Sequence, residues 1–104
     1  MFIAMNRFMI HEGHEEAFEE VWRNRDSSLK QVAGFQSFHL LKGAQDEATR
    51  CTLYASHTIW DSHAHFVDWT KSEHFRMAHK NAGDNKHMYA GPPVFEGFEA
   101  VLEE

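Results

Sequence analysis

The chain has 104 residues, of which 42% are hydrophobic and 25% are charged, an ordinary composition for a single globular domain spanning residues 1–104. The 16 acidic residues outnumber the 10 basic ones and give a net charge of −6. No nucleic acid and no anionic membrane is therefore expected as a partner. The one cysteine, Cys51, excludes an internal disulfide framework.

The first ten residues contain no basic leader, and the apolar runs are far shorter than a membrane span. We therefore expect a cytoplasmic protein. The alternating sequence of residues 2–10 predicts a strand, and both of its faces are largely apolar, so both are expected to be covered. Residues 14–30 are predicted to form a helix, with one apolar stripe made by Phe18, Val21, Trp22, Arg25 and Leu29.

Two further strands are predicted over residues 35–42 and 50–59, separated by a polar turn. The first of these places Phe35, Ser37, His39 and Leu41 on one face. A second helical region follows, with Asp61 as its expected N-cap, and Ser72 is expected to cap a further helix that reaches about residue 81. Residues 83–93 are predicted to be a loop, and residues 94–102 a final strand.

This β-α-β-β-α-β order predicts an α+β, ferredoxin-like fold with one antiparallel sheet and helices on one of its faces. The other face still carries apolar residues and would form a large exposed patch on a monomer. We therefore expect a homodimer packed sheet to sheet, a dimeric α+β barrel.

Three residues stand out chemically. Asn6 interrupts an apolar strand face, so its amide either bonds a neighbouring loop or points into a cavity. His79 lies one turn after Phe75 and is either a core or interface histidine or an axial ligand to heme iron. Trp69 is either a core residue or presses on a bound planar ligand.

The remaining candidates give weaker signals. His63 and His65 are two residues apart, which separates them around a helix, and no zinc motif is present. Cys51 alternates with apolar residues and is expected to be an inert core residue.

The segment DWTKSEHFRMAHK, residues 68–80, resembles a distinctive stretch of the IsdG-type heme-degrading monooxygenases, within the antibiotic biosynthesis monooxygenase superfamily. The early AMNRF, residues 4–8, is similar to that family's first strand. The resemblance implies that His79 is the heme ligand and that Trp69 forces the macrocycle out of plane. It also implies that Asn6 hydrogen-bonds on the opposite side of the heme.

The function implied by this resemblance is oxidative opening of heme with dioxygen and electrons from an external reductant, releasing iron and a bilin. Heme is then both substrate and cofactor, and the electron donor is unidentified. Trp22 and Phe75 are further expected heme contacts, and the loop with His87 would close over heme or supply a second ligand. Candidates for binding the heme propionates are Arg7, Arg23, Arg25 and Arg76.

Two alternatives remain open at this point. The same His79 would serve a protein that binds or stores heme without degrading it. The wider superfamily also suggests a cofactor-free monooxygenase acting on a quinol-like aromatic substrate.

Overall fold

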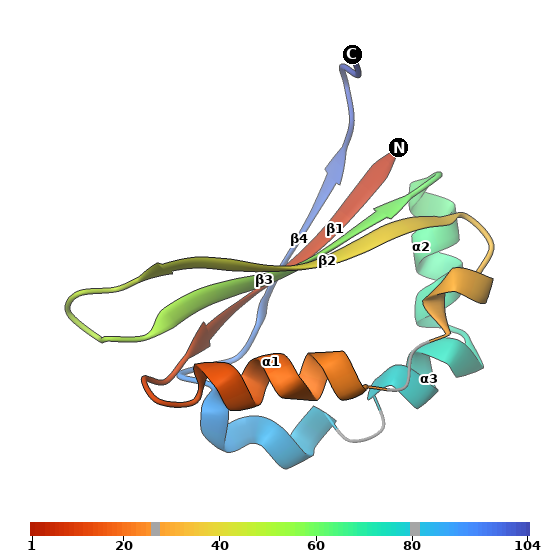
Figure 1. Cartoon of the computed structure of the whole chain (residues 1–104). Helices are drawn as coiled ribbons and strands as arrows, with labels where there is room; N and C mark the ends of the chain where they lie inside the picture. The colour runs from red at the N-terminus through yellow and green to blue at the C-terminus, as the bar shows by residue number, and fades with distance from the viewer. Residues whose placement is uncertain (26–27, 80–81) are drawn as a thin grey trace.

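The computed structural model describes residues 1–25, 28–79 and 82–104. Its strands are β1 (Phe2–Ile10), β2 (Phe35–Gln45), β3 (Thr52–Trp60) and β4 (Val94–Glu99). Its helices are α1 (Glu15–Asn24), α2 (His63–Thr70) and α3 (Glu73–His79), together with the short 3-10 segments η1 (Leu29–Gln31) and η2 (Ala82–Met88). The predicted β-α-β-β-α-β order is confirmed (Figure 1).

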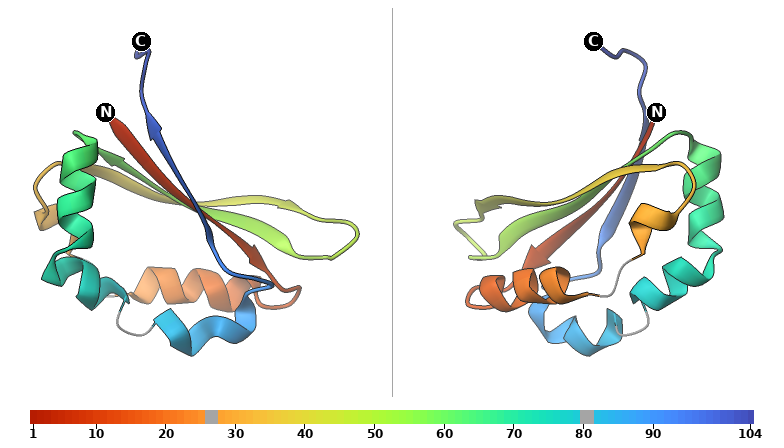
Figure 2. Two further views of the ribbon diagram at one scale, coloured as in Figure 1. Left: turned by 180° about the vertical axis from the view of Figure 1, so that it is seen from behind. Right: turned by 45° about the vertical axis from the view of Figure 1, so that its right-hand side comes forward.

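The four strands form one antiparallel sheet in the order β2-β3-β1-β4. The helices lie on one side of this sheet, and its other side carries no helix in the described residues (Figures 1 and 2). This is the predicted ferredoxin-like arrangement, in which β1 and β3 are central and carry the residues that face the helices.

The helix predicted over residues 14–30 is shorter in the structure. α1 ends at Asn24, because Arg25 adopts an extended backbone with φ −69° and ψ 139°. Residues 26–27 lie outside the described residues, and the chain then forms η1. The apolar stripe is therefore divided between two elements, although Phe18 and Leu29 are both buried as expected.

The predicted face of residues 35–42 is wrong at its first residue, because Phe35 packs against the core whereas Ser37, His39 and Leu41 share the opposite face. A register shift between Phe35 and Ser37 marks a bulge that reverses the alternation of β2. Phe38 and Leu40 consequently pack against the core, whereas His39 lies beside His57 on the opposite face.

The helix caps are partly as predicted. Ser62, and not Asp61, caps α2, because its Oγ accepts a hydrogen bond from the His65 backbone N at 3.2 Å. Ser72 caps α3 as predicted, accepting from the backbone N of Phe75 at 3.2 Å. Within the predicted loop of residues 83–93, most of the first half forms η2.

In the described residues the core divides into two clusters. Phe2, Ala4, Leu29, Trp60 and Trp69 form the first, and Phe8, Ile10, Phe18, Tyr54 and Met88 form the second. Both central strands contribute to both clusters, β1 through positions 2 and 4 and then 8 and 10. Between the two clusters, at the middle of the sheet, the inward-facing side chains are polar.

The helix-free side of the sheet, here called the open face, carries a broad set of partly exposed apolar residues. They are Ile3, Met5, Met9, Leu41, Leu53, Ala55, Ile59, Val94 and Phe98. An apolar surface of this extent is typical of an interaction site, and the expected sheet-to-sheet homodimer remains a prediction.

Candidate functional site

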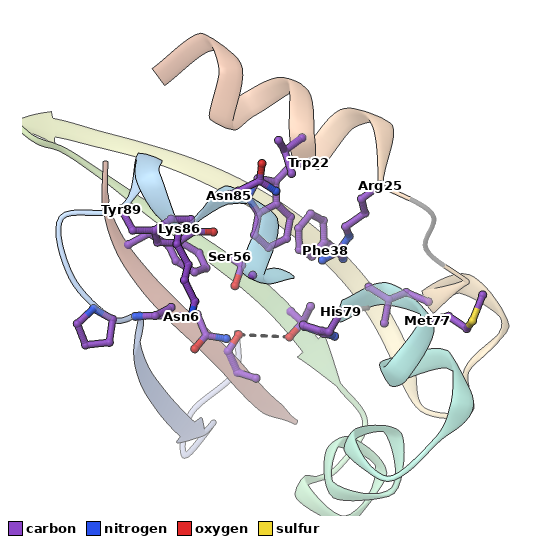
Figure 3. A pocket seen from close by; sticks show the side chains of 18 of the residues that line it. Asn6, Trp22, Arg25, Phe38, Ser56, Met77, His79, Asn85, Lys86 and Tyr89 are labelled. Carbon is purple, nitrogen blue, oxygen red and sulfur yellow. Dashed lines mark hydrogen bonds between the residues drawn. The ribbon is translucent and has the colours of Figure 1, made fainter. Parts of the chain in front are cut away.

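A cavity of about 1110 Å³ lies between the sheet and the helices. This is at or above the upper end of the range usual for small-molecule sites, so it has room for a large planar ligand. Asn6, Trp22 and His79, which the sequence singles out, line it (Figure 3), and so does Trp69. They come from β1, α1, α2 and α3, elements that the fold brings together around one space.

The sheet side of the cavity carries three polar side chains, here called the polar row: Asn6, Ser56 and Thr58. Asn6 of β1 is paired directly with Ser56 of β3, and Ala4 with Thr58. The Asn6 side chain makes no hydrogen bond to any residue that the structure describes. The first interpretation of Asn6, an amide that bonds a loop, therefore has no support in these residues, and the amide faces the cavity.

His79 lies at the end of α3 on the opposite, helical side of the cavity, and its side chain is exposed. Its Nδ1 is 2.8 Å from the carbonyl oxygen of Phe75. A carbonyl can only accept, so Nδ1 carries the proton in this contact. In a neutral ring this contact leaves the lone pair on Nε2, which is the atom required of a metal ligand.

Aromatic contacts hold the His79 ring in place. It stacks on Phe75 with 4.2 Å between ring centroids and meets Trp69 edge-on at 6.0 Å. Phe75 does not itself line the cavity. Its contribution is to orient His79, through ring stacking and through its backbone carbonyl, so the direct heme contact expected for Phe75 is not what this geometry favours.

Trp69 is a core residue, as one of its two interpretations predicted, and its contact with a bound planar ligand stays a prediction. It is buried, with 8% of its surface exposed, and it packs against Trp60 at 5.3 Å between centroids. The same indole also lines the cavity beside His79. A core tryptophan with one exposed edge gives the cavity a rigid wall.

Trp22 and Phe38 form a second aromatic wall, stacked at 5.6 Å with an interplanar angle of 18°. The Arg25 guanidinium lies over both rings, 4.5 Å from the Trp22 centroid and 5.0 Å from that of Phe38. Burial lowers the pKa of Arg25, and no carboxylate in the described residues pairs with it. Because buried charges are normally paired, this guanidinium is suited to an anionic ligand group.

The other candidate arginines are paired with acids. Arg7 pairs with Glu96, Arg76 pairs with Glu73, and Arg23 bonds Glu20 at 2.8 Å. None of these three lines the cavity, whereas Arg25 and Lys86 do.

The charge of the cavity wall differs from that of the whole molecule. Although the chain has 16 acidic residues, no aspartate or glutamate occurs among the described residues that line the cavity. Its ionisable groups include Arg25, Lys86, His79 and Tyr89, and burial raises the pKa of the Tyr89 phenol, which keeps it neutral. The wall therefore favours a ligand that is both flat and negatively charged.

Several other residues lie away from this cavity. His87 contacts His14 at 5.6 Å between centroids and does not line the cavity, so a second ligand from His87 is not supported. Cys51 is buried, as expected of a core residue. In the described residues no cluster of three or more metal-binding side chains occurs, and no helix there is long and apolar enough to cross a membrane.

Ser56, Thr58 and Phe38 are cavity residues that the sequence patterns did not single out. A signal for the first two was present. The inward positions of β3 read Tyr54, Ser56, Thr58 and Trp60, with a polar centre between bulky ends, as in β1. Phe38 was not predicted to face inward, because the bulge in β2 changes which side chains of this strand face the helices.

Comparison with known proteins places the chain in a family. Residues 1–81 match the model of the antibiotic biosynthesis monooxygenase family. A staphylobilin-producing heme oxygenase of Staphylococcus haemolyticus is 27% identical over 81 residues, covering 78% of this chain and 75% of that protein.

Two solved structures show the shared fold. MhuD, a heme-degrader from Mycobacterium tuberculosis with two hemes bound in its active site, superposes with a TM-score of 0.74. It is 21% identical, and the match covers 100% of this chain and 99% of that one. SnoaB, a cofactor-independent oxygenase from Streptomyces nogalater, gives a TM-score of 0.70 at 20% identity, covering 98% and 94%. With most of its length matched by the family model, the chain belongs to the antibiotic biosynthesis monooxygenase family.

Proposed function

We propose that the protein is a heme-degrading monooxygenase of the IsdG type, which opens the porphyrin with dioxygen and external electrons and releases iron and a bilin. One observation carries this proposal. On the helical side, the cavity has the His79 ring, whose Nδ1 contacts the Phe75 carbonyl and leaves Nε2 available. On the sheet side it has the Asn6 amide, which has no hydrogen-bond partner among the described residues.

The cavity fits heme in size, shape and charge. Its volume of about 1110 Å³ accommodates a macrocycle, and Trp69, Trp22 and Phe38 offer flat apolar walls. Heme carries two propionate groups, and the guanidinium of Arg25, which pairs with no acid in the part of the chain that the structure describes, is a suitable partner for one of them. Among the four arginines first considered, Arg25 is therefore the proposed propionate ligand.

The chemistry that heme supplies when bound is the activation of dioxygen, and the protein residues determine how heme is held. His79 would hold the iron through Nε2, with the Phe75 carbonyl bonded to Nδ1. Trp69, packed against Trp60, would press on the macrocycle. Asn6 would hydrogen-bond a small ligand on the side away from His79.

The relatives support this function over the alternatives. The curated relative is a heme oxygenase and MhuD is a heme-degrader, whereas SnoaB is cofactor-independent. The His79 imidazole on the cavity wall is a suitable ligand for heme iron. The proposed partners are heme, a second copy of the chain and an unidentified electron donor.

The proposal is tested by separating heme binding from heme turnover in single variants. His79→Ala is expected to abolish the Soret shift that accompanies hemin binding. Trp69→Ala and Asn6→Ala are expected to retain that shift and to lose most of the release of chelatable iron in the presence of ascorbate.

His74→Ala is the matched control, because His74 lies on the same helix but bonds Ser28 and does not line the cavity. It should bind and degrade hemin as the unmodified protein does. Normal turnover by all three site variants would contradict the proposal, and a persistent Soret band without iron release in the unmodified protein would favour a heme-binding module.

A further inference from the structure

The cavity contains a hydroxyl group that the proposed function has not used. Ser56 lies on the inward face of β3 and is buried, with 8% of its surface exposed. It lines the cavity, and Figure 3 shows it on the sheet side, where Asn6 also lies. Its position at the centre of the sheet places it in the polar row between the two core clusters.

The other hydroxyls on this face of β3 are all engaged within the protein. Thr52 donates to Glu15 at 3.1 Å, Tyr54 donates to Glu19 at 2.6 Å, and Thr58 donates to the carbonyl oxygen of Ala4 at 3.2 Å. Ser56 Oγ has no such partner in the described residues. Because Ser56 lines the cavity, its hydroxyl is available for a hydrogen bond to a molecule held there.

Ser56 and Asn6 lie next to each other on the sheet side of the cavity. They are directly opposite each other in the β1–β3 register, and such pairs have Cβ atoms about 5 Å apart. Neither side chain has a hydrogen-bond partner in the described residues, so an amide and a hydroxyl face the cavity together. His79 approaches from the helices, so a flat ligand held by His79 turns its other face toward this pair.

We propose that Ser56 and Asn6 form a two-point hydrogen-bonding site for a small ligand bound to heme on the side away from His79. This inference rests on the proposed function. Two donors from adjacent strands fix the direction of the bound ligand, where one would leave it free to turn. Ser56 thereby restricts which edge of the macrocycle the ligand can reach.

The test uses heme-loaded protein and two small probes. Fluoride on ferric heme accepts hydrogen bonds, and Ser56→Ala is expected to weaken fluoride binding about fivefold, the effect of one lost hydrogen bond. Carbon monoxide on ferrous heme should show its C–O stretch at higher wavenumber in Ser56→Ala, because a nearby donor weakens that bond. Ser56→Thr, which keeps the hydroxyl, should restore both values.

Thr52→Val is the matched control, because it removes a hydroxyl of the same strand face that donates to Glu15 and does not line the cavity. It should leave both probes close to their original values. Ser56→Cys, similar in size with a weak donor, should behave as Ser56→Ala does and provides a second variant if the alanine protein is unstable.

The outcomes of this test distinguish the role of Ser56 from the proposed heme-degrading function. Heme binding with unchanged fluoride affinity and C–O stretch in Ser56→Ala would overturn the role of Ser56 alone. Equal changes in Thr52→Val would also overturn it, because they would indicate general repacking. An unmodified protein that gives no Soret shift would overturn the heme function and this inference with it.

Discussion

At the scale of single residues, Arg25 gives the clearest prediction about the substrate. Its guanidinium lies over Trp22 and Phe38 with no carboxylate partner in the described residues, so the ligand is expected to bring the negative charge. Arg25→Ala should weaken hemin binding by about tenfold, as expected for a lost hydrogen bond to a charged group. The measurement is a Soret titration of each variant.

The same titration with heme dimethyl ester separates charge from packing, because Arg25 also covers two aromatic rings. The ester lacks the carboxylates, so Arg25→Ala should bind it as the unmodified protein does. Arg76→Ala, at an arginine already paired with Glu73 outside the cavity, is the control. Equal losses for hemin and its ester would contradict propionate binding by Arg25.

Individual residues also show how much of the candidate site could be predicted from the sequence. Asn6 was recognisable because an amide at an inward position of an apolar strand is unusual, and the structure places it in the cavity. His79 and Trp69 also line the cavity, but their roles came from a family resemblance. Arg25 was one of four candidates, because sequence spacing cannot show which arginines meet an acid in three dimensions.

At the scale of elements, the junction between η1 and β2 fixes α2 against the sheet. Gly34 has φ +83°, and a Cβ there would lie 2.2 Å from Cγ of His65. Gly34→Ala therefore combines a strained backbone with a steric clash, and should lower the free energy of unfolding by about 3 kcal/mol. Urea denaturation followed by circular dichroism measures the change.

Gly13 provides the comparison, because it has φ +92° and no atom within 4 Å of an added Cβ. Gly13→Ala tests backbone strain alone and should cost about 1 kcal/mol. Similar losses at both positions would show that the contact of Gly34 with His65 is not important for stability.

The boundaries and faces of the strands and helices could be predicted only in part from sequence patterns. The strand over residues 2–10 was predicted in full, because its alternation is uninterrupted. The bulge in β2 could not be predicted, since one extra residue reverses a face without changing composition. The stripe over residues 14–30 continues through η1, so periodicity alone extended α1 beyond Asn24.

At the scale of the whole molecule, the open face is the surface through which we expect the chain to assemble. Apolar residues from all four strands lie there, and no helix in the described residues covers them. The protein is expected to sediment at about 24 kDa, twice its 12.1 kDa chain mass. Ile59→Arg would place a charge among these residues and should shift the protein toward the monomer.

Ala17→Arg is the control, because it adds the same charge at an exposed position of α1. It should leave the mass at that of the dimer. An unmodified protein that sediments as a monomer at micromolar concentration would contradict the sheet-to-sheet dimer. The order of the elements was sufficient to predict this uncovered face, because both helical segments follow crossovers on one side of the sheet.

The central claim is that the protein binds heme in the cavity between the sheet and the helices and opens its porphyrin ring. The most direct test is an aerobic absorbance time course in which hemin and then ascorbate are added to the protein, with catalase present to remove peroxide. The account predicts a shifted Soret band that decays while a bilin-like absorbance and chelatable iron appear. A Soret band that does not shift when hemin is added would contradict it.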